Sequence, residues 1–149
     1  NRPAQEDPLT GLPNRSRLLG RLREATREAD MADADVALIM IDLDGFKAVN
    51  DAVGHAEGDR LLIETADRLR AAVGDAGLVA RIGGDEFAVA VSGSLAREMV
   101  AGAAASLVHS TDKPFVVHGF ASVSRNSSEL PWTAYLGSAA LRSAHFRLR

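Results

Sequence analysis

The sequence contains no cysteine among its 149 residues. This absence excludes disulfide bonds, zinc–thiolate centres and cysteine nucleophiles. Long hydrophobic runs are lacking as well, because the longest aliphatic run, Val36–Ile41, has only six residues. A membrane-spanning helix needs about 20 such residues. We therefore expect no membrane segment within this chain.

Acidic residues exceed basic residues only slightly, since the formal net charge is −3. We therefore expect no general attraction to nucleic acid. The charge is unevenly distributed: residues 1–112 hold 12 Lys and Arg against 19 Asp and Glu, whereas residues 113–149 hold 5 against 1. The length and the 46% hydrophobic content fit one globular domain. The start of the chain shows no signal-peptide pattern. Because it begins with Asn1 rather than Met, we expect the chain to be part of a larger protein.

Hydrophobic periodicity predicts helices packed on a mainly antiparallel sheet. Apolar residues at helical spacing follow Pro13 up to Ala29, and a buried strand is expected at Val36–Ile41. The remaining predicted elements are a helix at His55–Val73, a hairpin of strands Leu78–Ile82 and Phe87–Val91, a helix beginning at Ser94, and a strand at Pro114–Val117.

Acidic residues are concentrated at two predicted turns. Asp42 ends the buried strand, and Asp85 and Glu86 follow two glycines at the tip of the hairpin. If the hairpin lies beside the buried strand, these three carboxylates converge. Such a cluster suits Mg²⁺, which prefers oxygen ligands and keeps positions for water and substrate phosphates. Taken singly, each motif is more typical of an ordinary turn.

Four motifs follow one another between residues 7 and 91: Asp7–Arg15 (DPLTGLPNR), Asp42–Asp51 (DLDGFKAVND), Gly54–Asp59 (GHAEGD) and Arg81–Phe87 (RIGGDEF). In order and spacing these motifs together resemble the GGDEF family, the diguanylate cyclases. The resemblance implies an α/β (α+β) fold with a palm-like, ferredoxin-like antiparallel sheet covered by helices, as in nucleotidyl cyclases.

The resemblance implies a reaction and a set of partners. Family members join two GTP molecules into cyclic di-GMP and release two pyrophosphates. Each subunit of a homodimer holds one GTP, so that the 3′-hydroxyl of one nucleotide faces the α-phosphate of the other. The resemblance also implies a bacterial signalling protein with an upstream sensor domain, whose cyclase domain lies in the cytoplasm.

The resemblance assigns metal and catalytic roles to the acidic residues. Asp42 and Glu86 would be carboxylate ligands of Mg²⁺, or alternatively of Mn²⁺, and the Leu43 carbonyl would be a further ligand. Asp85 would either help to coordinate the metal or accept the proton of the 3′-hydroxyl. The division of these catalytic roles between Asp85 and Glu86 stays open at this point.

Substrate-binding roles are carried over in the same way. Gly83 and Gly84 would let the chain pass close to the GTP phosphates, and Phe46, through its main chain, and Lys47 would contact the triphosphate. Asn50 and Asp59 would recognise guanine. A carboxylate such as Asp59 accepts hydrogen bonds from the N1–H and N2–H₂ groups of guanine, and adenine lacks that donor pair.

Four residues within these motifs have more ordinary interpretations. His55 is expected to buttress the start of its helix rather than act as a base. Thr10 and Asn14 are expected to fix the N-terminal turn. Arg81 could contact a phosphate or pair with a neighbouring carboxylate, and the sequence leaves both open.

The sequence departs from the family pattern in two places. Gly74 and Gly77 stand where many members carry the Arg-x-x-Asp site that binds the inhibitory product, so feedback by that route is not expected. Residues 122–149 form an atypical Ser-, Ala- and Arg-rich tail after a cyclase core at 1–121. This tail keeps open two alternatives, a GTP- and Mg²⁺-binding module without turnover and a purely structural or dimerising domain.

Overall fold

The computed structural model describes residues 5–32, 35–43, 45–93 and 117–124. Within these ranges it contains three α-helices, one 3₁₀ turn and four strands. Their order is α1 (Arg15–Ala32), β1 (Asp35–Leu43), α2 (Phe46–Val53), α3 (His55–Val73), η2 (Gly74–Ala76), β2 (Gly77–Gly83), β3 (Glu86–Gly93) and β4 (Val117–Ser124).

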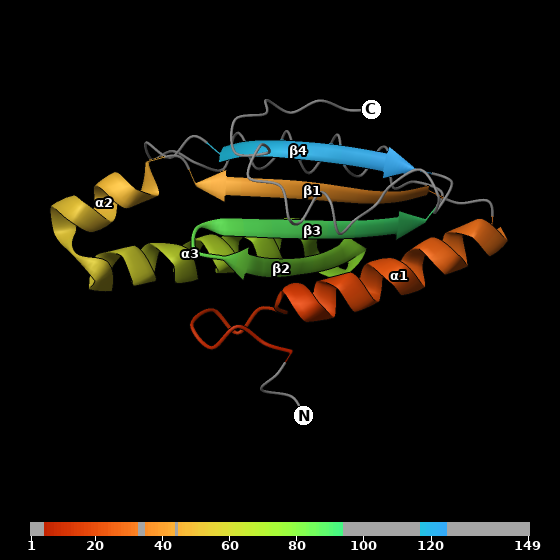
Figure 1. Ribbon diagram of the computed structural model, residues 1–149, viewed down its shortest axis with the longest axis horizontal. Coiled ribbons are helices and arrows are strands. Elements are labelled where there is room, and N and C mark those ends of the chain that lie inside the picture. Colours follow the sequence, from red (N-terminus) through yellow and green to blue (C-terminus); the bar gives the residue numbers. More distant parts are fainter. Residues whose placement is uncertain (1–4, 33–34, 44, 94–116, 125–149) are drawn as a thin grey trace.

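The four strands form one sheet in the order β2-β3-β1-β4, as Figure 1 shows. Every neighbouring pair is antiparallel. β1 therefore lies between β3 and β4, while β2 and β3 are joined by a hairpin turn. The predicted antiparallel sheet is confirmed, and the hairpin lies beside the buried strand, as expected.

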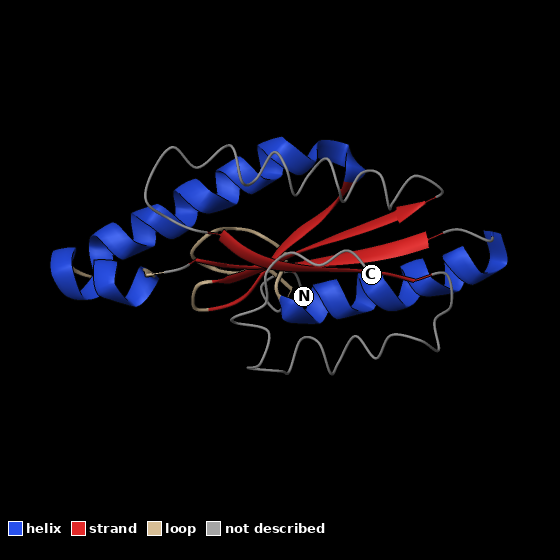
Figure 2. Ribbon diagram, turned by 90° about the horizontal axis from the view of Figure 1, so that it is seen from above, coloured by secondary structure: helices blue, strands red, loops and turns tan. Residues whose placement is uncertain are grey.

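One long helix covers each face of the sheet (Figure 2). Successive side chains of a strand point to opposite faces, and β1 buries both sets. Ile39 and Ile41 belong to the apolar cluster that contains Leu62 and Leu69 of α3. Leu38 and Met40 belong to a second cluster, which contains residues of α1. Burial on both faces explains why the sequence of β1 is hydrophobic without alternation.

The ends of the helices follow from local sequence. Asn14 precedes α1, and its Oδ1 accepts a hydrogen bond from the backbone N–H of Arg17 at 3.1 Å, as expected of an N-cap. Gly74 follows α3 with φ at +55°, a conformation that glycine adopts without strain. The predicted helix His55–Val73 is confirmed to the residue.

Other boundaries differ from the prediction. The helix α2 was not predicted, and the strand β1 extends beyond Val36–Ile41 at both ends. β4 begins at the last residue of the strand predicted at Pro114–Val117 and continues to Ser124, across the predicted boundary after residue 121. The rest of that predicted strand, the helix expected from Ser94 and the tail beyond Ser124 lie outside the described residues.

None of the helices within the described ranges is both long and apolar enough to span a membrane.

Candidate functional site

Asp42 and Glu86 lie directly opposite each other on neighbouring strands. Asp42 is near the end of β1, Glu86 is the first residue of β3, and the two are register partners in the antiparallel pair. Side chains at such positions have their Cβ atoms about 4.5–5.5 Å apart on one face of the sheet. Both residues are half-buried, and one carboxylate oxygen of Asp42, Oδ1, is buried. The fold thus brings together two acidic residues that are 44 positions apart in the sequence.

The turn between β2 and β3, residues Gly83–Glu86, is tied to the end of β1. The backbone N–H of Leu43 donates a hydrogen bond to the carbonyl of Asp85 at 3.2 Å. Gly84 has φ at +44°, which favours glycine. Gly83 and Gly84 are exposed, and a Cβ at either position would have no described heavy atom within 4 Å. The turn therefore leaves open space beside the acidic pair.

The expected convergence of three carboxylates is corrected to a pair. Within the described ranges, no group of three or more His, Asp or Glu side chains is arranged to hold a metal ion. Asp85 lies in the turn, one residue before the strand position that faces Asp42, so the cross-strand pairing joins only Asp42 and Glu86. The side chain of Leu43 is a buried hydrocarbon without a ligand atom, so only its backbone carbonyl can serve as a ligand.

The corner between α2 and α3 brings the two predicted guanine-binding residues near each other. The Asn50 side chain packs so closely on Gly58 that a Cβ on that glycine would overlap Asn50 Oδ1. Gly58 directly precedes Asp59, which is exposed. Asn50 Oδ1 is buried and has no hydrogen-bond partner among the described residues. The corner thus fixes one polar side chain beside an accessible carboxylate.

The other predicted substrate residues surround the start of these helices. Phe46 is half-buried and packs against the apolar cluster under α3, which leaves its main chain for ligand contacts. Lys47 is exposed on the first turn of α2. His55 is exposed as the first residue of α3.

Arg81 is a site residue whose role the sequence left undecided, and Asp7 was not predicted as its partner. The Arg81 NH1 nitrogen lies 3.1 Å from Asp7 Oδ1 and 3.1 Å from Asp7 Oδ2. The side chains are only 14% and 15% exposed, respectively. Thr10 donates to Asp7 Oδ2 from its backbone N–H at 2.8 Å and from its hydroxyl at 2.7 Å. The predicted structural roles of Thr10 and Asn14 in the N-terminal turn are confirmed.

These contacts determine the direction in which the pKa of Asp7 departs from its ordinary value. Partial burial raises the pKa of Asp7, but the side-chain and backbone hydrogen bonds from Thr10 and the hydrogen bond and charge of Arg81 outweigh it. The pKa of Asp7 is consequently lowered from its ordinary value of 3.8. The carboxylate stays ionised, which keeps the ion pair intact at neutral pH.

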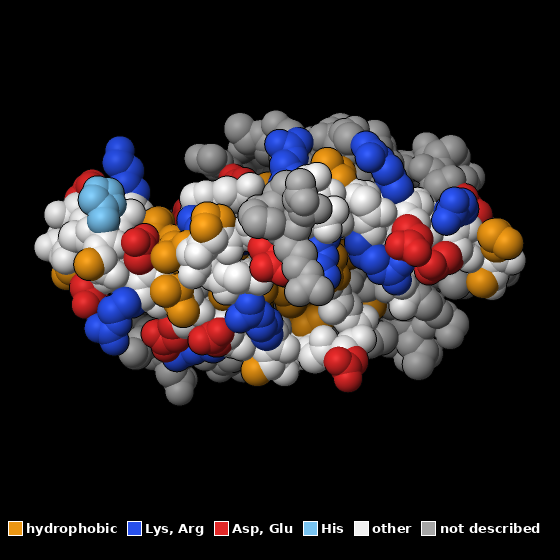
Figure 3. Space-filling view, turned by 90° about the horizontal axis from the view of Figure 1, so that it is seen from below, with side chains coloured by type: hydrophobic (Ala, Val, Ile, Leu, Met, Phe, Trp, Pro, Cys, Tyr) orange, Lys and Arg blue, Asp and Glu red, His pale blue; other side chains and the backbone are white. Residues whose placement is uncertain are grey.

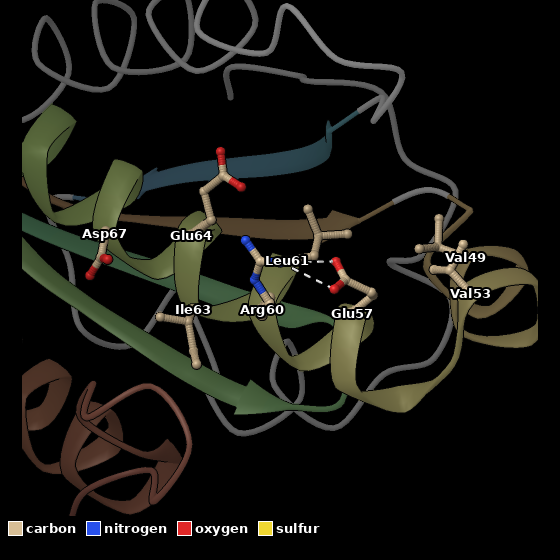
Figure 4. Close-up of a pocket in the computed structure, with 8 residues that line it drawn as sticks. All are labelled: Val49, Val53, Glu57, Arg60, Leu61, Ile63, Glu64 and Asp67. Carbon is tan, nitrogen blue, oxygen red and sulfur yellow. Dashed lines mark hydrogen bonds and ion pairs between the residues drawn. The ribbon is translucent and has the colours of Figure 1, made fainter.

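A hollow of about 520 Å³ lies along α2 and α3 (Figure 4). It combines apolar side chains from both helices with charged side chains from α3, including the Glu57–Arg60 ion pair. Asn50 and Asp59 do not line it, so it is distinct from the predicted guanine corner. Its lining residues are Val49, Val53, Glu57, Arg60, Leu61, Ile63, Glu64 and Asp67.

The surface carries both signs of charge. Figure 3 shows basic and acidic side chains interspersed on the side where the N-terminal segment lies. Ion pairs within helices include Arg21 with Glu28 in α1 at 3.5 Å and Arg68 with Glu64 in α3 at 2.6 Å. Exposed pairs of this kind contribute little to stability.

The sequence matches one family profile and several related proteins. The profile of the family described as "Diguanylate cyclase, GGDEF domain" matches residues 4–141. The chain is 52% identical over 88 residues to the bifunctional diguanylate cyclase/cyclic di-GMP phosphodiesterase MucR of Pseudomonas aeruginosa, a match that covers 59% of this chain and 13% of MucR. It is 49% identical over 86 residues to the diguanylate cyclase TpbB of the same species, covering 58% of this chain and 20% of TpbB.

Solved structures agree with the sequence matches. The GGDEF domain of TpbB from Pseudomonas aeruginosa has a TM-score of 0.72 and 34% identity, and the match covers 96% of this chain and 93% of that one. The diguanylate cyclase SiaD of that species, solved with its activator SiaC, has a TM-score of 0.77 and 29% identity, covering 99% and 63%. The palm-like fold that the sequence predicts is confirmed by these neighbours.

Proposed function

The chain belongs to the GGDEF domain family, and on that basis we propose that it is a diguanylate cyclase domain that condenses two GTP molecules into cyclic di-GMP and two pyrophosphates. The observation that carries the proposal is the Asp42–Glu86 pair, which lies beside a turn of two exposed glycines. Paired carboxylates next to open backbone suit a nucleoside triphosphate with its metal ion.

The acidic pair fits Mg²⁺, with Mn²⁺ as an alternative ion. Mg²⁺ is usually bound through one or two carboxylates together with substrate phosphates and water, so a two-carboxylate site is sufficient. Like charges directly opposite each other on a sheet are destabilising, and a cation reduces that repulsion. Asp42 and Glu86 would hold the ion, with the Leu43 carbonyl as a further ligand. When bound, the ion neutralises phosphate charge and polarises the α-phosphate.

The residues of the chain perform binding and positioning. The open backbone at Gly83 and Gly84 lets the phosphates approach the β2–β3 turn, since no Cβ occupies that space. The exposed Lys47 and the main chain at Phe46 lie at the start of α2, where they can meet the triphosphate. Asp85 is available in the same turn to accept the proton of the attacking 3′-hydroxyl.

Guanine recognition is assigned to the α2–α3 corner. Asp59 is exposed and presents a carboxylate that accepts from the N1–H and N2–H₂ of guanine. Asn50 is held against Gly58 with its Oδ1 buried, so its amide nitrogen would be the atom that donates to the base. Because adenine lacks the paired N–H donors, this corner favours GTP over ATP.

Turnover is proposed to require a homodimer, because one site holds only one of the two nucleotides. The chain spans 13% and 20% of the relatives MucR and TpbB, which is consistent with a catalytic domain controlled by an upstream sensor. The proposed location is the cytoplasm, where GTP is available.

A second candidate is a GTP- and Mg²⁺-binding module without turnover. The atypical composition of residues 122–149 favours it, because family members normally supply a further strand, a helix and a basic phosphate contact from this region. Binding without product formation separates this candidate from the cyclase.

The variant Glu86→Gln tests the metal assignment. It keeps the size of the side chain and removes its charge, so we expect loss of cyclic di-GMP formation with little change in thermal stability. The control is Arg68→Gln, which removes an exposed ion pair on α3 and is expected to retain activity. Full activity of Glu86→Gln, measured by nucleotide chromatography, would refute the assignment of Glu86.

The variant Asp59→Asn tests base recognition. The amide presents a donor as well as an acceptor to the two N–H groups of guanine, so we expect roughly tenfold weaker GTP binding or more. Discrimination against ATP should fall as well. Calorimetry with both nucleotides checks this, and an unchanged GTP-to-ATP affinity ratio speaks against the assignment.

A further inference from the structure

Arg81 joins the N-terminal turn to the β2–β3 turn. Its NH1 nitrogen donates to both carboxylate oxygens of Asp7, each at 3.1 Å. Its Nε and NH2 nitrogens donate to the carbonyl of Gly84, at 3.1 Å and 2.8 Å. All three guanidinium nitrogens are therefore engaged by protein atoms. The sequence separation between Asp7 and Arg81 is 74 residues, so this is a tertiary contact.

The Asp7 end of this connection is itself well anchored. Thr10 donates two hydrogen bonds to Asp7 Oδ2. The backbone N–H of Asp7 donates to the Leu12 carbonyl at 2.7 Å, and that of Arg81 donates to the Pro13 carbonyl at 3.0 Å. A planar guanidinium held by a carboxylate on a fixed turn has little freedom to rotate.

The Gly84 end has less support of its own. No described heavy atom lies within 4 Å of where a Cβ would stand at Gly83 or Gly84, so side-chain packing does not hold this part of the turn. The next residue, Asp85, accepts the backbone N–H of Leu43. Glu86 follows, opposite Asp42. A shift of the Gly84 carbonyl therefore changes the position of both the turn and the acidic pair.

We propose that Arg81 is a positioning residue: it fixes the Gly84 carbonyl, keeps Glu86 opposite Asp42, and is itself oriented by Asp7. The guanidinium is assigned this role rather than that of a phosphate ligand, because each of its three nitrogens already donates to a protein oxygen. The catalytic consequence rests on the proposed cyclase function, whereas the structural consequence does not.

Hydrogen exchange and kinetics together test this role. In Arg81→Gln we expect the backbone amide of Leu43, which is bonded to the turn, to exchange about tenfold faster or more. Amides in the middle of α3 should exchange as in the wild type. The kcat for cyclic di-GMP formation should fall about tenfold or more, while the KM for GTP changes less than about threefold. A phosphate ligand would instead raise KM.

A coupling measurement uses Asp7→Asn. If Asp7 acts through Arg81, the decrease in kcat of the double variant Asp7→Asn/Arg81→Gln is no larger than that of Arg81→Gln alone. The control Arg68→Gln, which removes an exposed ion pair of α3, leaves both exchange and kcat unchanged. Additive losses overturn the coupling between Asp7 and Arg81.

Two further outcomes are decisive. If Arg81→Gln does not fold, Arg81→Lys replaces it: one ammonium cannot reproduce both bonds, so the same faster exchange at Leu43 is expected. Wild-type exchange at Leu43 in a folded Arg81 variant overturns the proposal. If the wild-type chain makes no cyclic di-GMP, the proposed function fails, but the exchange measurement still decides the positioning role.

Discussion

The side chain of Asn50 in α2 packs directly against the backbone of Gly58 in α3, and no methyl group fits between them. The two residues belong to different helices, and their contact sets the corner at which Asp59 is presented. We therefore expect Gly58→Ala to displace the Asn50 amide. GTP binding should weaken about tenfold or more, as calorimetry would measure.

A matched control is available in α1. Gly20 is also a helical glycine, but a Cβ there meets no described atom within 4 Å. Gly20→Ala should raise the free energy of unfolding by about 0.5–1 kcal/mol and leave GTP affinity unchanged. Equal GTP affinity in Gly58→Ala and Gly20→Ala would show that the Asn50–Gly58 contact is unimportant for the nucleotide.

Magnesium should stabilise the folded protein through the Asp42–Glu86 pair. An ion that binds only the native state, at 100 times its Kd, adds about 2.7 kcal/mol to the free energy of unfolding. The melting temperature of the wild type should thus rise with Mg²⁺ concentration, and that of Glu86→Gln should rise much less. A parallel rise in both proteins would place the ion elsewhere. This thermal readout does not depend on enzymatic activity.

The Asp7–Arg81 pair predicts a pH dependence of stability. Because the folded-state pKa of Asp7 is lowered below 3.8, its contribution is present at higher pH and is lost as pH falls through the folded-state pKa. Asp7→Asn should cost about 2 kcal/mol near neutrality. Urea unfolding should show the gap between wild type and variant closing only below pH 3.8. A gap that stays constant to lower pH argues against the ion pair as its source.

We expect no inhibitory binding of the product, cyclic di-GMP, at the start of β2. Gly74 and Gly77 carry no side chains to bind an anionic product there. A hollow of about 310 Å³ lies beside Gly77, and among the described residues Arg21 is the one basic residue that lines it. The Arg21 NH1 nitrogen already lies 3.5 Å from a carboxylate oxygen of Glu28. Initial rates should not fall when cyclic di-GMP is added at micromolar concentration. Strong inhibition that vanishes in Arg21→Ala would contradict this prediction.

Long periodic elements were predictable from the sequence, and a short one was not. The helix α3 has buried residues at Leu62, Ala66, Leu69 and Val73, and this spacing fixes its inner face. By contrast, the eight-residue helix α2 has no fully buried residue and no side-chain N-cap. A helix of that length depends on tertiary contacts, which local patterns do not report.

The candidate site was predictable in its residue types but only partly in its geometry. The two predicted turns identified Asp42 and Glu86, while the register that places them opposite each other belongs to the folded sheet. The contact between Arg81 and Asp7 spans 74 residues, so spacing along the chain could not assign it. Spacing along the chain also could not separate Asp85 from the cross-strand pair, so the sequence predicted three converging carboxylates where the structure, within its described ranges, has two.

The cyclase assignment is tested most directly by incubating the purified chain with GTP and Mg²⁺ and separating the nucleotides by chromatography. We expect cyclic di-GMP and pyrophosphate from the wild type, and neither from Glu86→Gln. Failure of the folded wild-type chain to form cyclic di-GMP, with GTP still bound, would contradict the cyclase assignment and support a binding module instead.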